Sequence, residues 1–244
     1  MFDKIRKVLL IVCVGVFLYA SFNLGKIFYD YYQVDKQTEE IKDEYVKPKE
    51  NKKSVENPLE RKIDFVSLKK RNKDVAGWIY IPGTRIDEVI LHGKTNDTYI
   101  HTTIDKKYSF AGEVFMDSIN KPDFTDSQTI IYGHNMKNGS RFAALRKFSN
   151  KEFFDKNPYV YIYLPDGSIY VYSVYVIKKV NATEDKYYTN NVDYNKYIKQ
   201  LQSGAVHTRS VSNKKAPLVL LSTCVAASGE ARWVVGGRLE KVVK

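Results

Sequence analysis

The distribution of apolar and polar positions divides the chain into three parts. Residues 8–24 contain no charged side chain, residues 33–60 are mostly polar, and from Gly77 onward short apolar runs alternate with turn residues. The uncharged run approaches the ~20 residues that cross a bilayer as a helix, so it predicts a membrane-inserted segment. The later short runs, bounded by Gly, Pro, Asn or Asp, predict β-strands.

About eight of these runs have the length and composition of strands. The sequence Pro165-Asp166-Gly167 between two of them is a strong hairpin signal. Helical spacing of apolar residues predicts a short amphipathic helix near residues 63–68 and two helical insertions at 141–154 and 192–202. Many short strands with turn chemistry between them indicate a mainly β domain, either a sandwich or a barrel. The predicted strands are residues 78–81, 86–91, 112–116, 129–132, 159–163, 169–177, 218–223 and 232–240.

The N-terminal region predicts a single-pass membrane protein. Residues 1–7 form a short basic tail, residues 8–28 the transmembrane anchor, and residues 29–60 a polar stalk or surface helix. A cleaved signal peptide is the alternative, but the sequence lacks a clear small-residue cleavage site, and tyrosines follow the run as at a membrane interface. Basic residues before the span predict a cytoplasmic N-terminus, with residues 61–244, which contain the predicted strands, outside the cell.

The net charge of +11 at pH 7 raises the possibility of nucleic-acid binding. The lysines are spread along the chain rather than gathered in one motif, and the predicted extracellular location removes such a partner. A basic surface facing anionic membrane or wall polymers is the simpler explanation. The sequence contains no Cys-x-x-Cys, His-Glu-x-x-His or acidic loop motif, so we expect no metal site and no cofactor.

Cys224 follows the apolar run 218–223, and a cysteine at the end of a buried strand lies at a sheet rim, where a nucleophile can meet a substrate. The other cysteine, Cys13, lies in the apolar N-terminal run, so no disulfide within the folded domain is expected. A lone cysteine is more often a buried, inert thiol. The residues near Cys224 nevertheless favour a nucleophile.

Arg232 opens the next apolar run, after the loop 225–231, so the two predicted strands would bring it to the same rim as Cys224. A guanidinium stays charged and offers several donors, which suits it to stabilise an oxyanion. The alternative is an ordinary surface arginine.

A thiol also needs a base to become a thiolate. The sequence has four histidines, and His134 is the best placed, because it follows the buried run 129–132 and starts a Gly/Asn-rich loop. His92 ends another predicted strand and is a second candidate for the rim. His101 and His207 lie among polar residues, which is typical of surface positions.

Three segments together resemble the signature of the sortases: Tyr-Gly-His-Asn at 132–135, Leu-Ser-Thr-Cys at 221–224, and Arg232 within a strand that ends in Gly-Arg-Leu. The flanking sequence resembles class B, over roughly residues 60–242. This resemblance implies an eight-stranded sortase-type β-barrel with an N-terminal helical region and an extra helix before the cysteine strand. It implies a membrane-anchored cysteine transpeptidase of Gram-positive bacteria.

Such an enzyme cleaves the C-terminal sorting signal of secreted surface proteins after Thr and links them, through a thioester, to an amine of peptidoglycan or of its lipid-linked precursor. The resemblance implies that Cys224 attacks, Arg232 stabilises the oxyanion and His134 moves protons. It implies a signal of the Asn-Pro-x-Thr-Asn or Pro-x-Thr-Gly type. By this resemblance the candidate substrate-binding residues are Asn96, Ile100, Thr183, Tyr187, Tyr188, Ser222 and Thr223. The alternative is that these residues only cap loops and pack.

Two other function classes are compatible with these residues. A secreted cysteine protease would use the same nucleophile and base but transfer the acyl group to water. A catalytically silent, wall-associated binding module would need neither. A product in which an added amine is joined to the cleaved peptide would distinguish a transpeptidase from the protease. Loss of peptide turnover after alkylation of Cys224 would distinguish an enzyme from the binding module.

Overall fold

The computed structural model describes residues 2–47, 57–181, 193–224 and 231–244. The chain divides into two compact units, Met1–Glu40 and Ile41–Lys244. Most of helix α1 (Phe2–Tyr45) belongs to the first unit, and its last turn belongs to the second. The first unit contains the predicted apolar run, whose large side chains from Val8 to Leu24 are exposed. With a mean hydropathy of 2.2 over its most apolar window, α1 is compatible with a single membrane anchor.

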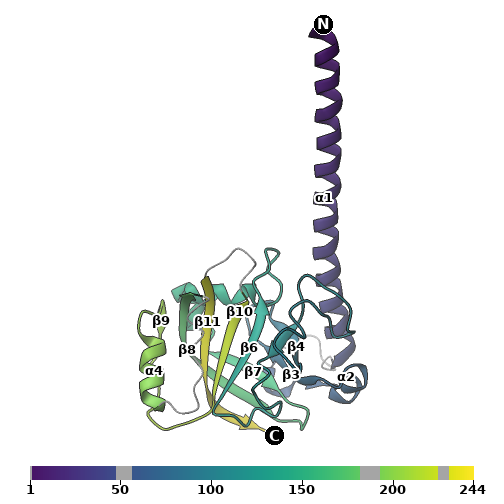
Figure 1. The fold of residues 1–244 in the computed structure, drawn as a ribbon. Helices are drawn as coiled ribbons and strands as arrows, with labels where there is room; N and C mark the ends of the chain where they lie inside the picture. The colour runs from purple at the N-terminus through teal and green to yellow at the C-terminus, as the bar shows by residue number, and fades with distance from the viewer. Residues whose placement is uncertain (1, 48–56, 182–192, 225–230) are drawn as a thin grey trace. The chain divides into compact units, whose positions relative to one another are not determined.

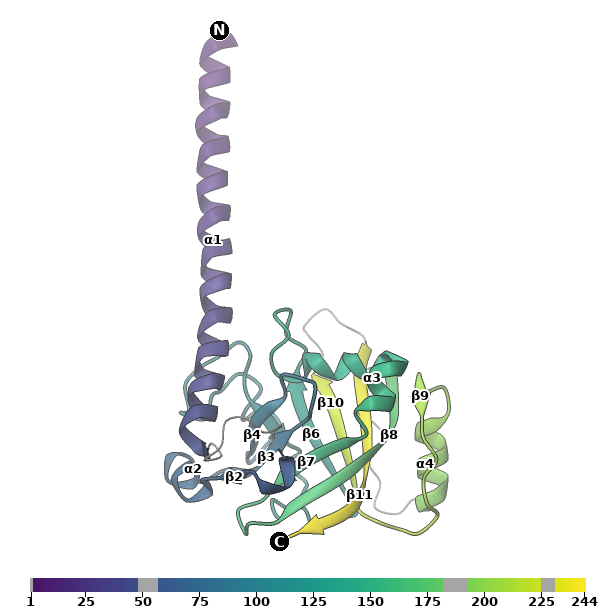
Figure 2. The ribbon, with the colours of Figure 1, turned by 180° about the vertical axis from the view of Figure 1, so that it is seen from behind.

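Eight strands of the second unit close into a barrel, which confirms the predicted fold. Their order is β11-β10-β6-β5-β4-β3-β7-β8, and β11 also pairs with β8 to complete the circuit. Figure 1 shows β6, β10 and β11 side by side in the wall, and Figure 2 shows β7 and β8 from behind. The strands are β3 (Val75–Tyr80), β4 (Asp87–His92), β5 (Val114–Met116), β6 (Gln128–His134), β7 (Tyr159–Tyr163), β8 (Ile169–Asn181), β10 (Leu218–Cys224) and β11 (Ala231–Val243).

The barrel interior is a continuous apolar core. Alternate residues of β10 face opposite sides of the wall: Val219 and Leu221 join the interior core, whereas Leu218 and Leu220 pack outside it, with Ile198 and Leu201 of the extra helix α4 (Tyr194–Gln202). A strand buried on both faces needs apolar residues at successive positions, which explains the unbroken run before Cys224. The short strand β9 (His207–Thr208) extends the sheet from β8.

The helical insertion predicted at 141–154 consists of two separate helical elements. The 3-10 helix η2 (Phe142–Ser149) contributes Phe142, Leu145 and Phe148 to the interior core. Asn150 then ends η2 and begins α3 (Lys151–Lys156), where its side-chain oxygen accepts a hydrogen bond from the Phe153 N–H at 2.9 Å. A side-chain cap of this kind starts a new helix instead of continuing the previous one.

The strand predicted at 129–132 is longer in the structure, because Gly133 lies inside β6 and is buried. A Cβ atom at this position would lie 2.7 Å from Cγ of Phe142. The glycine is therefore explained by the close approach of η2 to the strand, and β6 continues to His134.

The start of the second unit packs on the outside of the barrel. The predicted amphipathic helix is confirmed as α2 (Phe65–Arg71), capped by Asp64, whose carboxylate accepts a hydrogen bond from the Ser67 N–H at 3.0 Å. Ile41 and Tyr45, at the end of α1, are buried in the same outer core as Leu68 of α2. The strands β1 (Val46–Lys47) and β2 (Lys62–Ile63) pair with each other, and η1 (Pro58–Glu60) precedes β2.

Candidate active site

The ends of β6 and β10 bring two of the three predicted catalytic positions together. The two strands are parallel neighbours, and Cys224 is the register partner of His134. Each of these residues is the last in its strand. Neighbouring strands in a sheet lie about 4.8 Å apart, so residues separated by ninety positions in the sequence face each other across a single strand spacing.

Strand β11 brings the third predicted position to the same end of the barrel. It runs antiparallel to β10, with Ser222 paired with Val234. One residue further, the Trp233 N–H donates a hydrogen bond to Oγ1 of Thr223 at 2.9 Å. Arg232, which is half-buried, therefore enters β11 at the level where β10 ends in Cys224.

The imidazole of His134 has a defined hydrogen-bond partner. Its Nε2 lies 2.8 Å from the carbonyl oxygen of Ile100. A carbonyl oxygen can only accept, so Nε2 carries a proton in this arrangement, and Nδ1 is the nitrogen that remains for proton transfer. Sequence reasoning could not identify this contact, because a backbone carbonyl carries no signature of residue type.

The surroundings of His134 favour its neutral form. Burial lowers the pKa of the imidazole below its usual value of 6.5, and the positive charges of His101 and Arg141 act in the same direction. The hydrogen bond to the Ile100 carbonyl stabilises the protonated ring and partly opposes them. The exposed His101 ring, predicted only as a surface residue, stacks on His134 with a centroid distance of 5.5 Å and an interplanar angle of 17°.

The predicted substrate-binding residues fall into three groups. Ile100 is half-buried and contacts His134 through its carbonyl, while Ser222 and Thr223 are buried in β10 next to Cys224. Asn96 is anchored within the protein. The remaining three, Thr183, Tyr187 and Tyr188, lie outside the described residues.

Asn96 is held through both ends of its side-chain amide. Its Nδ2 donates to Oδ2 of Asp117 at 3.2 Å, and its Oδ1 accepts from the Ser118 N–H at 2.7 Å. The hydroxyl of Tyr132, two residues before His134, donates to the same Asp117 oxygen at 2.9 Å. Asn96 is thus linked to strand β6 through Asp117.

The two remaining histidines lie elsewhere. His92 ends β4 and pairs with Met116, which in turn pairs with Ile131 in the middle of β6, so its backbone is level with the middle of β6 and not its end. His207 in β9 donates through Nε2 to the carbonyl of Ser149 at 2.8 Å. Within the described residues no group of three or more His, Cys, Asp or Glu side chains could hold a metal ion.

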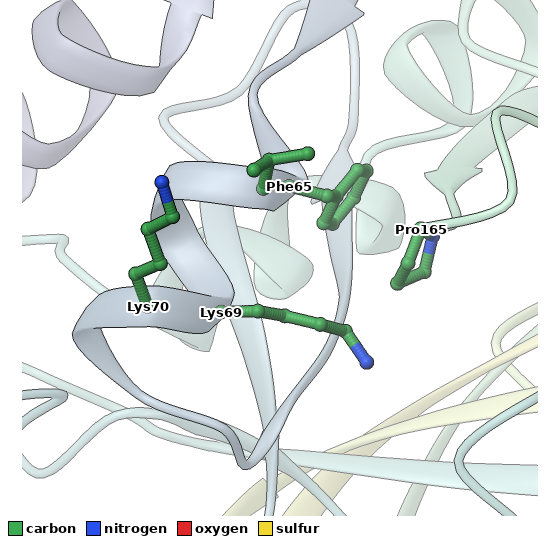
Figure 3. A pocket seen from close by; sticks show the side chains of 5 residues that line it. Phe65, Lys69, Lys70 and Pro165 are labelled. Carbon is green, nitrogen blue, oxygen red and sulfur yellow. The ribbon is translucent and has the colours of Figure 1, made fainter.

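A surface hollow of about 380 Å³ lies at helix α2, away from these residues. Figure 3 shows Lys69 extending to the Pro165 side of the hollow, while Lys70 points to the other side. None of the predicted catalytic or substrate-binding residues that the structure describes lines this hollow. Its lining residues are Phe65, Val66, Lys69, Lys70 and Pro165.

Comparison with known proteins identifies the family. Residues 79–240, more than half of the chain, match the family model of the sortase domain. The chain belongs to the sortase family. Sortase B of Listeria monocytogenes is 32% identical over 243 residues, 96% of each chain. The match extends through the N-terminal helix as well as the barrel.

Solved structures place this sortase in class B. Sortase B of Clostridium perfringens superposes with a TM-score of 0.67 and 31% identity, covering 73% of this chain and all of the other. A Staphylococcus aureus sortase B–substrate complex superposes with a TM-score of 0.66 and 29% identity, covering 72% and 84%. This sortase is therefore a cysteine transpeptidase of the class B type.

Proposed function

We propose that this sortase cleaves a C-terminal sorting signal after Thr and transfers the cleaved protein, through a thioester on Cys224, to an amine of peptidoglycan or of its lipid-linked precursor. The observation that carries the proposal is the pairing of Cys224 with His134 at the ends of parallel neighbouring strands. Adjacent positions on neighbouring strands support the proposal, because covalent catalysis needs a nucleophile and a base close together.

The reaction begins when Nδ1 of the neutral His134 ring accepts the proton of the Cys224 thiol, and the resulting thiolate attacks the carbonyl carbon of the threonine. The tetrahedral intermediate collapses when the bond to the departing amine breaks, and Nδ1 of His134 supplies the proton which that amine needs. The products of this half are a thioester on Cys224 and a released C-terminal peptide. An incoming amine then attacks the thioester, His134 accepts its proton, and the thiolate of Cys224 leaves.

Arg232 has a separate role in this scheme, which is to stabilise the negative charge that develops on the threonine carbonyl oxygen. Its half-buried position at the start of β11, beside the end of β10, supports this role. A charged donor that is already in place when the oxyanion forms needs no reorganisation, and removal of one such donor costs about a hundred- to a thousandfold in kcat.

For substrate binding, we propose a groove that includes Asn96, Ile100, Thr183, Tyr187, Tyr188, Ser222 and Thr223, which takes a signal of the Asn-Pro-x-Thr-Asn or Pro-x-Thr-Gly type. The S. aureus sortase B solved as a substrate complex supports a substrate site in this fold. The segment 8–28 would anchor the enzyme with its N-terminus in the cytoplasm and residues 61–244 outside, where wall precursors and secreted proteins meet.

The test is turnover of fluorogenic peptides that carry either signal, with and without an added amine, followed by mass spectrometry of the products and of the enzyme. We expect an amide-linked product only when the amine is present, and a covalent acyl adduct that is absent from the Cys224→Ala variant. His134→Ala should lose about two to four decades of rate, and Arg232→Ala about two to three.

Other outcomes would separate the alternatives. Hydrolysis with no amide product at any amine concentration would identify a protease. Turnover that survives complete alkylation of Cys224 would remove the nucleophile from the scheme.

A further inference from the structure

A buried charge cluster lies beside the loop that leaves His134. The guanidinium of Arg141 donates through Nη1 to Oε2 of Glu88 and pairs through Nη2 with Oε2 of Glu113 at 3.0 Å. The side chains of all three residues are at most 3% exposed. Burial raises the pKa of Glu113, and the nearby Glu88 adds to this effect while Arg141 opposes it. Buried charges of this kind are retained only where their partners are well placed.

The backbone of Arg141 is also unusual. Its φ is 52° and its ψ is −135°, a combination that L-residues rarely adopt. Strained residues persist where the surrounding contacts over-determine them, and they cluster at functional sites. Arg141 also forms an isolated antiparallel bridge with Asn135, the residue after His134. The ion pairs of Arg141 therefore fix the returning end of the loop that begins at His134.

The same cluster holds the carbonyl that contacts the imidazole. Oε1 of Glu113 accepts a hydrogen bond from the Ile104 N–H at 3.1 Å, and the Glu113 N–H donates to the Tyr99 carbonyl at 3.0 Å. These two bonds lie on either side of Ile100 in the sequence, whose carbonyl accepts from His134 Nε2. Gly112 packs closely against this carbonyl, since a Cβ at this positive-φ residue would lie 2.1 Å from the Ile100 oxygen.

We propose that Arg141 is a positioning residue for His134, acting through two connections. Through the bridge to Asn135 it fixes the backbone that carries the imidazole, and through Glu113 it fixes the Ile100 carbonyl that binds Nε2. Together these contacts hold the proton on Nε2 and direct Nδ1 toward the reaction. The proposal rests on the proposed role of His134 and adds a residue that does not touch the reacting atoms.

The experiment compares Arg141→Met and Arg141→Lys with a matched control in the full-length enzyme. Arg61 is also a buried arginine, 6% exposed, and pairs with Asp87 at 2.6 Å. Asp87 is adjacent to Glu88 in β4, and successive residues of a strand face opposite sides, so Arg61→Met removes a comparable ion pair on the other face. The measurements are kcat and KM for the peptide reaction, the Tm, and the 15N shifts of Nδ1 and Nε2 of His134.

We expect Arg141→Met to lower kcat about ten- to a hundredfold with a smaller change in KM, because misplacement by about 1 Å costs up to two decades. The 15N shifts should report a mixture of tautomers, and Arg141→Lys should recover part of both effects. Arg61→Met should lower the Tm comparably while its kcat and the His134 tautomer stay as in the parent enzyme.

The proposal is overturned if Arg141→Met lowers the Tm but leaves kcat and the His134 tautomer unchanged. If Arg141→Met does not fold, Glu113→Gln decides in its place, because it weakens the same connection while keeping an oxygen for the Ile104 N–H. An unchanged tautomer and kcat in folded Glu113→Gln would equally overturn the proposal. The tautomer measurement requires no turnover, so its outcome is independent of whether the proposed peptide reaction is correct.

Discussion

His134 is surrounded by groups that oppose a positive charge on its ring. Burial is the largest influence, and the stacked ring of His101 contributes both cover and positive charge. Since the folded-state pKa lies below the usual value of 6.5, the neutral ring is stable in the folded protein to a lower pH than in the unfolded chain. The stability contributed by this site is present above the unfolded pKa and is lost as the pH falls through the folded pKa.

Removal of His101 should therefore raise the pKa of His134. In His101→Ala the imidazole gains water and loses a neighbouring positive charge, and both changes move its pKa toward 6.5. His101→Phe keeps an aromatic ring over His134 but removes the charge, so its shift should be the smaller of the two. An NMR titration of the His134 ring protons measures both shifts, and a lower pKa in His101→Ala would contradict the assigned role of the stacked ring.

At the residue scale, the sequence indicates candidate side chains but not their contacts. Cys224, His134 and Arg232 are proposed as catalytic residues because each stands at the end or start of an apolar run, and strand ends meet at a barrel rim. The sequence could not predict in this way that the Ile100 carbonyl and the His101 ring contact His134, or that Arg141 forms buried ion pairs. Their contacts depend on how the loop residues 99–104 and 135–141 fold back on strand β6, which no local pattern encodes.

At the scale of elements, helix α4 packs on the outside of the barrel. Ile198 and Leu201 pack on the outer face of β8, β10 and β11. The hydroxyl of Tyr197 accepts a hydrogen bond from Nε2 of Gln128 at 2.6 Å, which ties the helix to the start of β6. In the sequence, the proposed substrate-binding residues Thr183, Tyr187 and Tyr188 come shortly before Tyr194, the first residue of α4.

Loosening α4 should weaken substrate binding more than chemistry. Leu201 is 1% exposed, and Leu201→Ala should lower the free energy of unfolding by about 2–5 kcal/mol. We expect KM for the signal peptide to rise severalfold while kcat changes less. Leu68→Ala in α2 is the matched control, because Leu68 is 0% exposed on a different helix and its loss should change stability without changing KM. Equal KM values in the two variants would mean that the packing of α4 does not affect substrate binding.

The pattern of apolar residues predicted where most strands lie, but it did not predict where each strand begins and ends. The strand at 159–163 was predicted with its observed bounds, since a turn signal follows it closely. The predicted strand 169–177 extends to Asn181, because β8 pairs along its length with the equally long β11. The extension depends on the pairing of β8 with β11, which the local alternation of apolar and polar residues does not predict.

At the scale of the whole molecule, the second unit begins earlier than residue 61, which the sequence predicted as the start of the catalytic domain. Ile41 and Tyr45 are each 4% exposed and belong to the outer core with Leu68. The pairing of Val46 with Ile63 joins the end of α1 to the chain entering α2. The sequence did not predict these contacts, because residues 29–60 are mostly polar and two apolar side chains one helical turn apart are a weak signal in a charged helix.

Two truncations should therefore differ in stability. A chain of residues 41–244 keeps the whole second unit, and we expect it to unfold near the temperature of the full-length protein. A chain of residues 61–244 loses Ile41 and Tyr45 from the core. Burial of a large apolar side chain contributes about 1.5–3 kcal/mol, so the loss of both should lower the Tm by on the order of 10 °C.

Thermal unfolding of both truncated chains, followed by circular dichroism in the same buffer, provides the measurement. In full-length Ile41→Ala the same core contact is lost while the chain length is kept, so a Tm decrease there separates packing from truncation. Equal Tm values for the two truncated chains would mean that the last turn of α1 adds nothing to the barrel. In that case residue 61 would be an adequate start for the folded enzyme, as the composition of the chain alone suggested.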